Sequence, residues 1–298
     1  MQRAGHRLRA TIPALPALLL WAVPAMSAVD INALWDFAKP ALSEERFLAA
    51  LATAHGDDAL ILKTQIARSW GLRGDFERAR AVLAEVEPRI NGAGPEAQAR
   101  YWLELGRTWC SVAHDEASVT DDAKARARTA YGNALALARA ARLDVLAIDT
   151  IHMDASVDRS PENGLRVADQ ALAVMAASTQ PDARNWEASL RNNRGYALQQ
   201  LGRYDEALAE FELALAARER QGKPGGIRIA HWMIANTLRL MGRLDEALAI
   251  QLRLERECDA AGEPDPYVFE ELEAIYRAQG NGERAAHYAA RLKATQNR

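Results

Sequence analysis

One short phrase returns along this chain at nearly regular intervals. Residues 202–208 read GRYDEAL and residues 242–248 read GRLDEAL, while looser copies occupy residues 74–79 (GDFERA) and 280–285 (GNGERA). Such self-similarity is typical of a protein built from stacked copies of one helical unit. The repeated phrase therefore predicts a helical array before any other property of the sequence is considered.

Each part of the phrase has a local physical role. The glycine can adopt the left-handed backbone conformation that ends a helix, and the aromatic residue or leucine two positions later fills the corner of the turn. The alanine five positions after the glycine, as at Ala207 and Ala247, lets two helices approach closely. We expect every copy to form a tight turn between two antiparallel helices.

The segment before one of these turns carries a matching first-helix pattern. Trp102, Leu105, Gly106 and Trp109 follow the pattern W-x2-L-G-x2-Y, with tryptophan in the tyrosine place. After another turn, Ala207, Phe211 and Ala214 fit the pattern of the second helix. In these residues the chain resembles the tetratricopeptide repeat family, as found in bacteria, and the resemblance covers residues 58–298.

The resemblance implies an all-α fold, a right-handed superhelical α-solenoid of about six helix-turn-helix pairs. The small residue after each turn serves as a ruler, and its spacings are 48, 37, 43, 40 and 38 residues. The 48-residue step predicts an insertion, placed most simply at residues 113–122 between the two helices of the second pair. The third pair is irregular, because Gly164 stands where alanine is usual and His152 where a small residue is usual. A first helix over residues 43–54 would cap the stack.

The first 28 residues differ from the rest. Arg3, Arg7 and Arg9 precede an apolar run over residues 10–25, and small residues follow, which is the layout of a secretory signal peptide. Two interpretations stay open. The segment is a signal peptide that directs export to a bacterial periplasm or secretion. Alternatively, the start codon is assigned too far upstream and the protein is cytoplasmic and begins near Val29. We therefore divide the chain into residues 1–28 and a solenoid over residues 29–298. The apolar run is shorter than the roughly 20 residues of a transmembrane helix, so no integral membrane span is expected.

Charge argues against nucleic acid as the partner. Loss of residues 1–28 would remove three arginines and no acid, leaving 34 basic and 40 acidic side chains and a formal charge of −6. Such a balance matches a phosphate backbone poorly. Cys110 and Cys258 lie 148 residues apart, and we expect two free thiols because distant units of a solenoid do not touch.

Catalytic spacings are not found in the sequence. None of the histidines stands in an H-E-x-x-H motif, and there is no phosphate-binding glycine loop, no G-x-S-x-G elbow and no zinc spacing. We interpret His114 as part of a solvated loop and His152 as a packed or hydrogen-bonded structural histidine. Asp121 and Asp122 indicate a helix start, and Glu270 with Glu271 a solvated helix face. The sequence predicts no enzyme, no cofactor and no metal.

The resemblance further implies that the first helices of successive pairs line a concave groove, at positions 2, 5, 9 and 12 when the turn glycine is position 15. Mapped onto this chain, that rule selects Thr64 and Arg68; Arg100, Leu103 and Arg107; Asn192, Tyr196 and Gln199; Trp232, Asn236 and Arg239; and Tyr267, Glu270, Ala274 and Arg277. Asn193 joins them, since family members that hold peptide backbones carry asparagine at that place.

This mixed lining predicts a binding function. Asparagine can pair with the backbone of an extended peptide, arginine can grip a carboxylate through two hydrogen bonds, and Trp232 and Tyr196 offer flat apolar surface. We therefore expect a non-catalytic scaffold that binds a peptide or a flexible segment of another protein. Two alternatives stay open: a regulatory module that binds a small ligand near the irregular third pair, and an RNA-binding helical repeat.

Overall fold

The computed structural model describes residues 29–222 and 224–296, which form α-helices joined by short turns and two 3-10 segments. The proposed signal peptide, residues 1–28, lies outside the described residues. In the described part of the chain, each helix packs mainly on the helices before and after it, and α3 also packs closely on α5, the next helix but one. This is an α-solenoid, as predicted.

Six antiparallel helix pairs make up most of the stack. Their bounds are α3 (Gly56–Leu72) with α4 (Phe76–Ile90), α5 (Pro95–Trp109) with α6 (Asp121–Ala140), α7 (Asp144–Asp154) with α8 (Pro161–Ala177), α9 (Glu187–Gln200) with α10 (Tyr204–Gln221), α11 (Pro224–Leu240) with α12 (Leu244–Ala261), and α13 (Pro266–Ala278) with α14 (Gly282–Gln296). A short helix α1 (Ile31–Leu34) and the capping helix α2 (Pro40–Leu51) precede them. The capping helix thus begins and ends three residues earlier than predicted.

The turn glycines have the predicted conformation. Gly74, Gly202, Gly242 and Gly280 all have φ between 73° and 79°, in the left-handed region where a side chain is unfavourable. After Gly202 and Gly242, the backbone N–H of the next residue donates to a carbonyl in the last turn of the preceding helix, which closes the turn. The turn from α6 to α7, between the second and third pairs, has Arg142 in the left-handed conformation (φ 55°), so this turn has no glycine signature.

Close contact within pairs depends on glycine in the first helix. A Cβ added to Gly195 of α9 would lie 2.7 Å from Cε1 of Phe211, which is fully buried on α10. A Cβ added to Gly106 of α5 would lie 2.5 Å from Cε1 of Tyr131 on α6. In both pairs an aromatic ring thus packs directly on the helix backbone.

The insertion in the second pair falls where the spacing predicted it. Helix α5 ends at Trp109 and α6 begins at Asp121, so the insertion lies within the second pair and includes a 3-10 turn at Glu116–Ser118. His114 is more ordered than predicted for a solvated loop, because its ring stacks on Phe76 with a centroid distance of 3.6 Å. A second 3-10 helix, η2 (Pro181–Trp186), separates the third pair from the fourth.

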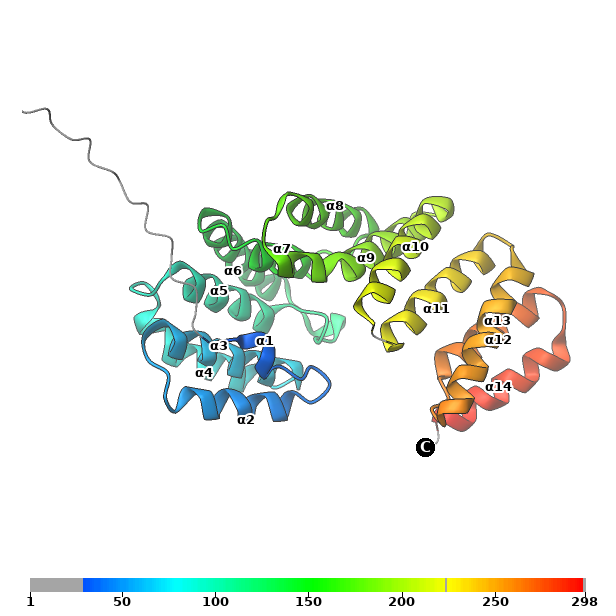
Figure 1. Cartoon of the computed structure of the whole chain (residues 1–298), viewed down its shortest axis with the longest axis horizontal. Coiled ribbons are helices and arrows are strands. Elements are labelled where there is room, and N and C mark those ends of the chain that lie inside the picture. Colours follow the sequence, from blue (N-terminus) through cyan, green and yellow to red (C-terminus); the bar gives the residue numbers. More distant parts are fainter. Residues whose placement is uncertain (1–28, 223, 297–298) are drawn as a thin grey trace, which may run out of the picture.

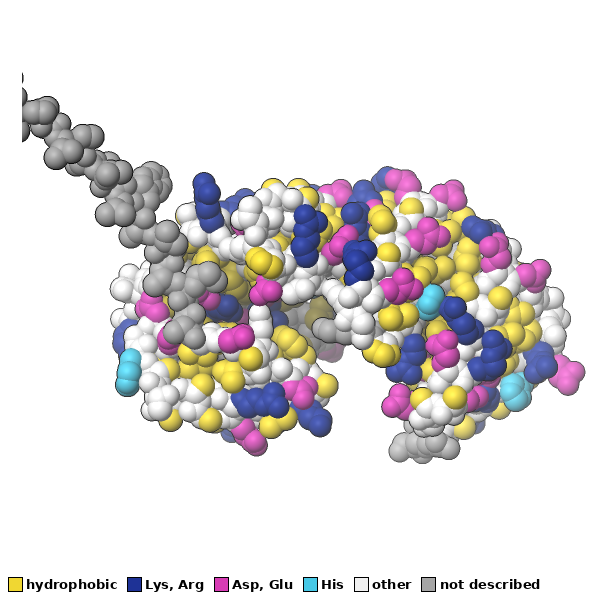
Figure 2. Space-filling view, in the orientation of Figure 1, with side chains coloured by type: hydrophobic (Ala, Val, Ile, Leu, Met, Phe, Trp, Pro, Cys, Tyr) yellow, Lys and Arg dark blue, Asp and Glu magenta, His cyan; other side chains and the backbone are white. Residues whose placement is uncertain are grey.

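The stack bends into an arch (Figure 1), with α1–α6 at one end and α11–α14 at the other. Helices α7 and α9 lie on the inner side of the arch and α8 on the outer side. Figure 2 shows that side chains do not fill the opening between the two ends. Among the described residues, no helix is both long and apolar enough to cross a bilayer.

Candidate functional site

Polar side chains link the first helices of successive pairs across the inner face of the arch. Gln199 on α9 donates to Asn236 on α11 at 3.0 Å, and Asn236 donates to Glu271 on α13 at 2.9 Å. Arg239, one turn after Asn236, also donates to Glu271, at 2.6 Å. We call these four residues the C-terminal ladder. The hydrogen bonds of this ladder satisfy polar groups that would otherwise bind solvent or a partner.

One member of this ladder, Glu271, is buried although it was predicted to be exposed. Glu271 was expected on a solvated helix face together with Glu270, but only 3% of Glu271 is exposed. Its carboxylate lies between α11 and α13, where the side chains of Asn236 and Arg239 both reach it. Glu270 is exposed, as expected. The prediction was wrong because adjacent residues of a helix point about 100° apart. Two neighbouring glutamates can therefore differ in burial.

A more deeply buried charge cluster joins the second and third pairs. Arg107 on α5 donates to Glu104 and to Asp149 on α7, each at 2.5 Å. The side chains of Glu104, Asp149 and Arg107 are 2%, 9% and 12% exposed. Burial alone would raise the pKa of Asp149, but the guanidinium groups of Arg107 and Arg68 hold it below its ordinary value. Arg107 thus forms ion pairs with two carboxylates of the protein itself.

The irregular third pair carries a structural histidine. Nδ1 of His152 accepts a hydrogen bond from Nδ2 of Asn193 on α9 at 3.1 Å, and the ring contacts Trp186 of η2 with a centroid distance of 5.6 Å. Burial lowers the pKa of His152 although the nearby Asp149 raises it, so the neutral ring that accepts this hydrogen bond is favoured. Asn193 thus joins the third and fourth pairs.

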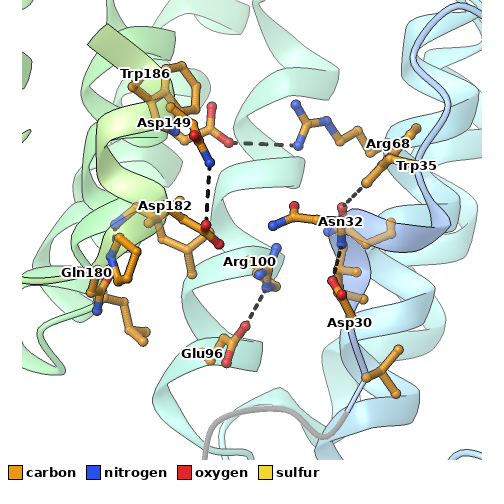
Figure 3. Close-up of a pocket in the computed structure, with 18 of the residues that line it drawn as sticks. Asp30, Asn32, Trp35, Arg68, Glu96, Arg100, Asp149, Gln180, Asp182 and Trp186 are labelled. Carbon is orange, nitrogen blue, oxygen red and sulfur yellow. Dashed lines mark hydrogen bonds and ion pairs between the residues drawn. The ribbon is translucent and has the colours of Figure 1, made fainter. Parts of the chain in front are cut away.

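The inner face has a partly open cavity of about 650 Å³ near the N-terminal end of the arch. Its walls come from α1 and the residues around it, from α3 and α5, and from α7, η2 and the start of α9 on the opposite side. Figure 3 shows Arg68 reaching across the top of this space to Asp149, with Arg100 on the wall formed by α5 and Asp182 facing Asn32 across it. The two guanidinium groups and the acids Asp30, Glu96, Asp149 and Asp182 give the lining both signs of charge.

An aromatic cluster beside this cavity was not found from the sequence. The rings of Trp35 and Phe37 stack with a centroid distance of 4.7 Å, and the guanidinium of Arg68 lies 5.4 Å and 5.2 Å from their centres. Nε1 of Trp35 donates to Gln65 of α3 at 3.1 Å. The segment between α1 and α2 therefore lies against the inner face. No periodic pattern marks a residue that packs through a loop, so these contacts could not be predicted from the sequence.

The remaining predicted groove residues are more accessible. Tyr196 and Tyr267 are 50% and 65% exposed, whereas Trp232 is partly buried and donates from Nε1 to the carbonyl of Tyr267 at 3.0 Å. Asn192 is half-buried, and Arg277 is exposed and pairs with Glu273 one turn earlier. Three residues expected on the groove, Thr64, Leu103 and Gln199, are buried at 0%, 1% and 9% exposure. Their exposure was predicted wrongly, whereas the binding role of the others stays a prediction.

In the part of the chain that the structure describes, histidine, cysteine and carboxylate side chains do not gather into a metal site. No group of three or more His, Cys, Asp or Glu residues there could hold a metal ion. Cys110 and Cys258 are free and buried, as predicted. The charged groups gathered on the inner face bind one another or line the cavity.

A stack of antiparallel helix pairs with a polar and aromatic inner face defines a helical-repeat protein of the kind used in protein–protein interaction. Residues 186–256 match the family model described as Tetratricopeptide repeat. This segment of the chain, which runs from η2 into α12, thus carries tetratricopeptide repeats. No curated protein matches its sequence.

Solved structures support the same fold. The chain is similar to PilW, described as a widely conserved type IV pilus biogenesis factor, with a TM-score of 0.55 and 20% identity over 79% of this chain and 93% of PilW. It is also similar to a signal-transduction ATPase with a tetratricopeptide repeat sensor from Pyrococcus horikoshii, with a TM-score of 0.62 and 12% identity over 87% of this chain but only 39% of the ATPase. The apo form of RapI gives a TM-score of 0.50 and 13% identity over 79% of this chain and 76% of RapI.

Proposed function

We propose that this protein is a non-catalytic scaffold that binds an extended segment of a partner protein on the inner face of α9, α11 and α13. The observation that supports this most is the exposure of aromatic side chains there. Tyr196 and Tyr267 leave about half or more of their surface in solvent, and the ring of Trp232 lies 6.5 Å from that of Tyr267. Exposed aromatic residues on one face are typical of a binding surface.

The spacing between first helices supports the arrangement of these three residues in one row. Hydrogen bonds between α9, α11 and α13 join residues 35 to 38 apart, as in Trp232 with Tyr267 and Gln199 with Asn236 and Thr237. Tyr196 precedes Trp232 by 36 residues, within this range, so we expect the two side chains to lie near each other. We call Tyr196, Trp232 and Tyr267 the aromatic row. Its direction across the helices suits an extended chain, which presents alternate side chains to one surface.

The other candidate residues surround this row. Asn192 lies about one turn before Tyr196 on α9, and Glu270 lies about one turn after Tyr267 on α13. Other candidates have a different role, because their hydrogen bonds join the first helices of neighbouring pairs: Arg107, Asn193, Gln199, Asn236 and Arg239. We propose that these five residues fix the spacing of the groove and that the aromatic row contacts the partner.

Replacing both Tyr196 and Tyr267 by serine should weaken peptide binding at least tenfold, because exposed aromatic anchors carry much of the energy of such interfaces. Peptides selected from a random phage-displayed library on the wild-type protein provide the probe, and fluorescence polarisation provides the affinity. Leu213→Ser is a matched control, since Leu213 is 45% exposed but lies on the second helix of its pair. If the double variant binds the selected peptides as tightly as the wild type, the aromatic row is not the site.

The RNA-binding alternative finds less support. Arg107, Arg239 and Arg277 of the predicted groove each pair with a carboxylate, so their charges are already neutralised within the protein. The small-ligand alternative is favoured by a specific observation, the cavity beside the third pair.

We further propose that residues 1–28 direct export. The supporting observation is the basic, apolar and small-residue order of this segment. Amino-terminal sequencing of the protein recovered from a periplasmic extract should find a chain that starts between Pro24 and Val29. The same start found only in cytosol would indicate a misplaced start codon, and an intact Met1 would also exclude cleavage.

A further inference from the structure

The cavity near the N-terminal end of the arch contains a guanidinium group with unused donors. Arg68 forms no hydrogen bond with the described residues, and its Nε is buried without a partner. Its Nη1 lies 3.8 Å from Oδ2 of Asp149, too far for a hydrogen bond, and its other contacts are the faces of Trp35 and Phe37. Buried donors in native proteins are normally satisfied. The position of Arg68 therefore indicates an acceptor that comes from outside the described part of the chain.

A second guanidinium lines the same space. Arg100 on α5 donates from Nε to Glu96 at 2.9 Å, and its two terminal nitrogens form no hydrogen bond with the described residues. Arg68 and Arg100 lie on α3 and α5, which pack side by side. Burial and the nearby Arg107 lower the pKa of Arg68, as expected for a buried cation whose charge is only partly balanced by neighbouring carboxylates. A carboxylate is the acceptor that guanidinium groups bind best.

The acids of the lining restrict the ligand further. Asp149 shares the top of the cavity with Arg68, while Asp30 and Asp182 lie on opposite walls. A simple anion would satisfy the arginines but would approach these carboxylates without compensation. A ligand that carries an ammonium group beside its carboxylate meets both signs of charge. Arg68 and Asp149 lie next to each other at the cavity, as the two charged groups of an α-amino acid lie adjacent on one carbon atom.

The rest of the lining is apolar and aromatic. Trp35, Leu146, Val145 and Trp186 border the cavity together with Pro181 of η2. Flat rings and branched side chains of this kind bind an apolar or aromatic group. A cavity of about 650 Å³ accommodates a free amino acid with a large side chain.

We propose that this cavity binds a free α-amino acid with an apolar or aromatic side chain. Its carboxylate pairs with Arg68 and Arg100, its ammonium group pairs with Asp149, and its side chain lies between Trp35 and Trp186. The site lies beside the irregular third pair and is separate from the aromatic row. It gives the protein a small-molecule input in addition to its proposed partner.

Isothermal titration with L-phenylalanine, L-tryptophan and L-leucine tests this proposal. We expect binding by the wild type, together with a rise in melting temperature. N-acetyl-L-phenylalanine lacks the ammonium group and L-phenylalaninamide lacks the carboxylate, and each should bind at least tenfold more weakly than L-phenylalanine. Equal binding of either derivative, or no binding of any of the three amino acids at millimolar concentration, overturns the proposal.

Variants locate the ligand within the chain. Arg68→Gln and Arg100→Gln should each weaken binding of L-phenylalanine at least tenfold, with unchanged helical circular dichroism. Arg126→Gln is the matched control: Nε of Arg126 pairs with Asp122 one turn earlier, as Nε of Arg100 pairs with Glu96, but it lies on the outer helix α6. Full binding by both cavity variants excludes the site. The Tyr196→Ser/Tyr267→Ser double variant should bind L-phenylalanine normally, which separates this proposal from partner binding.

Discussion

Replacing Arg107 by methionine is expected to lower the free energy of unfolding by about 3–5 kcal/mol at neutral pH. Arg107 is the residue that neutralises Glu104 and Asp149 together, and both of these carboxylates are at least nine-tenths buried. Methionine fills a similar volume but leaves two buried negative charges without this partner. Urea unfolding followed by circular dichroism measures the change, and the slope should stay the same because the folded state buries similar surface.

The loss should depend on pH in a defined direction. In the wild type, Arg107 and Arg68 outweigh burial and depress the pKa of Asp149, so its contribution to stability exists at neutral pH and is lost as pH falls through the folded pKa. Without Arg107, burial prevails and raises that pKa, so protonation relieves a penalty as pH falls. The stability difference between the two proteins should therefore shrink between about pH 7 and about pH 4.

An exposed arginine separates this effect from the loss of any positive charge. Arg253 on α12 is 45% exposed and lies 3.8 Å from Glu257 one turn later. Arg253→Met should change the free energy of unfolding by less than about 1 kcal/mol, as for surface ion pairs in general. A loss for Arg107→Met that is equally small, or that grows on acidification, would contradict the buried network.

Replacing Gly195 by alanine is expected to destabilise the fourth pair by about 1–3 kcal/mol. The new Cβ would lie 2.7 Å from Cε1 of Phe211, a separation that folded proteins do not tolerate. Phe211 is fully buried and cannot move without opening the contact between α9 and α10. This cost exceeds the gain of about 0.5–1 kcal/mol that alanine normally brings to a helix. Thermal unfolding of the variant should show a lower midpoint.

The same substitution should have the opposite sign at a glycine with free space. Gly132 lies inside α6, and a Cβ added there meets no atom within 4 Å. Gly132→Ala should therefore stabilise the protein by about 0.5–1 kcal/mol. In addition, Phe211→Leu should cost less in the Gly195→Ala background than in the wild type, because the smaller side chain relieves the clash. Destabilisation by both glycine substitutions would show that steric contact is not the cause.

The helices and turns of this protein could be predicted from its sequence because they depend on neighbours along the chain. Glycine at 202 and 242 ends a helix whatever lies elsewhere, and the alanines at 207 and 247 follow at a fixed distance. The insertion in the second pair was equally visible as a longer spacing. The turn at Arg142 carried no such signal, because an arginine there adopts the left-handed conformation only under the constraint of the surrounding helices.

The inner face was predicted less completely. Position within a repeat indicated which residues turn inward, and Tyr196 and Tyr267 are exposed there. It did not indicate which of them bind each other. Asn236 and Arg239 both meet Glu271, a residue that the sequence alone assigned to solvent. Such pairing depends on the offset between helices about 35 residues apart, which only the packed stack defines.

The repeated hairpin, the order of the helices and the absence of catalytic spacings could be found from residue order, since each depends on local backbone preferences or on spacing along the chain. The cavity could be found only in the folded stack. Trp35, Arg68 and Asp149 belong to three elements spread over more than a hundred residues, and only the curvature of the stack brings them together. That curvature is a sum of small rotations between neighbouring pairs, set by side-chain packing at every interface.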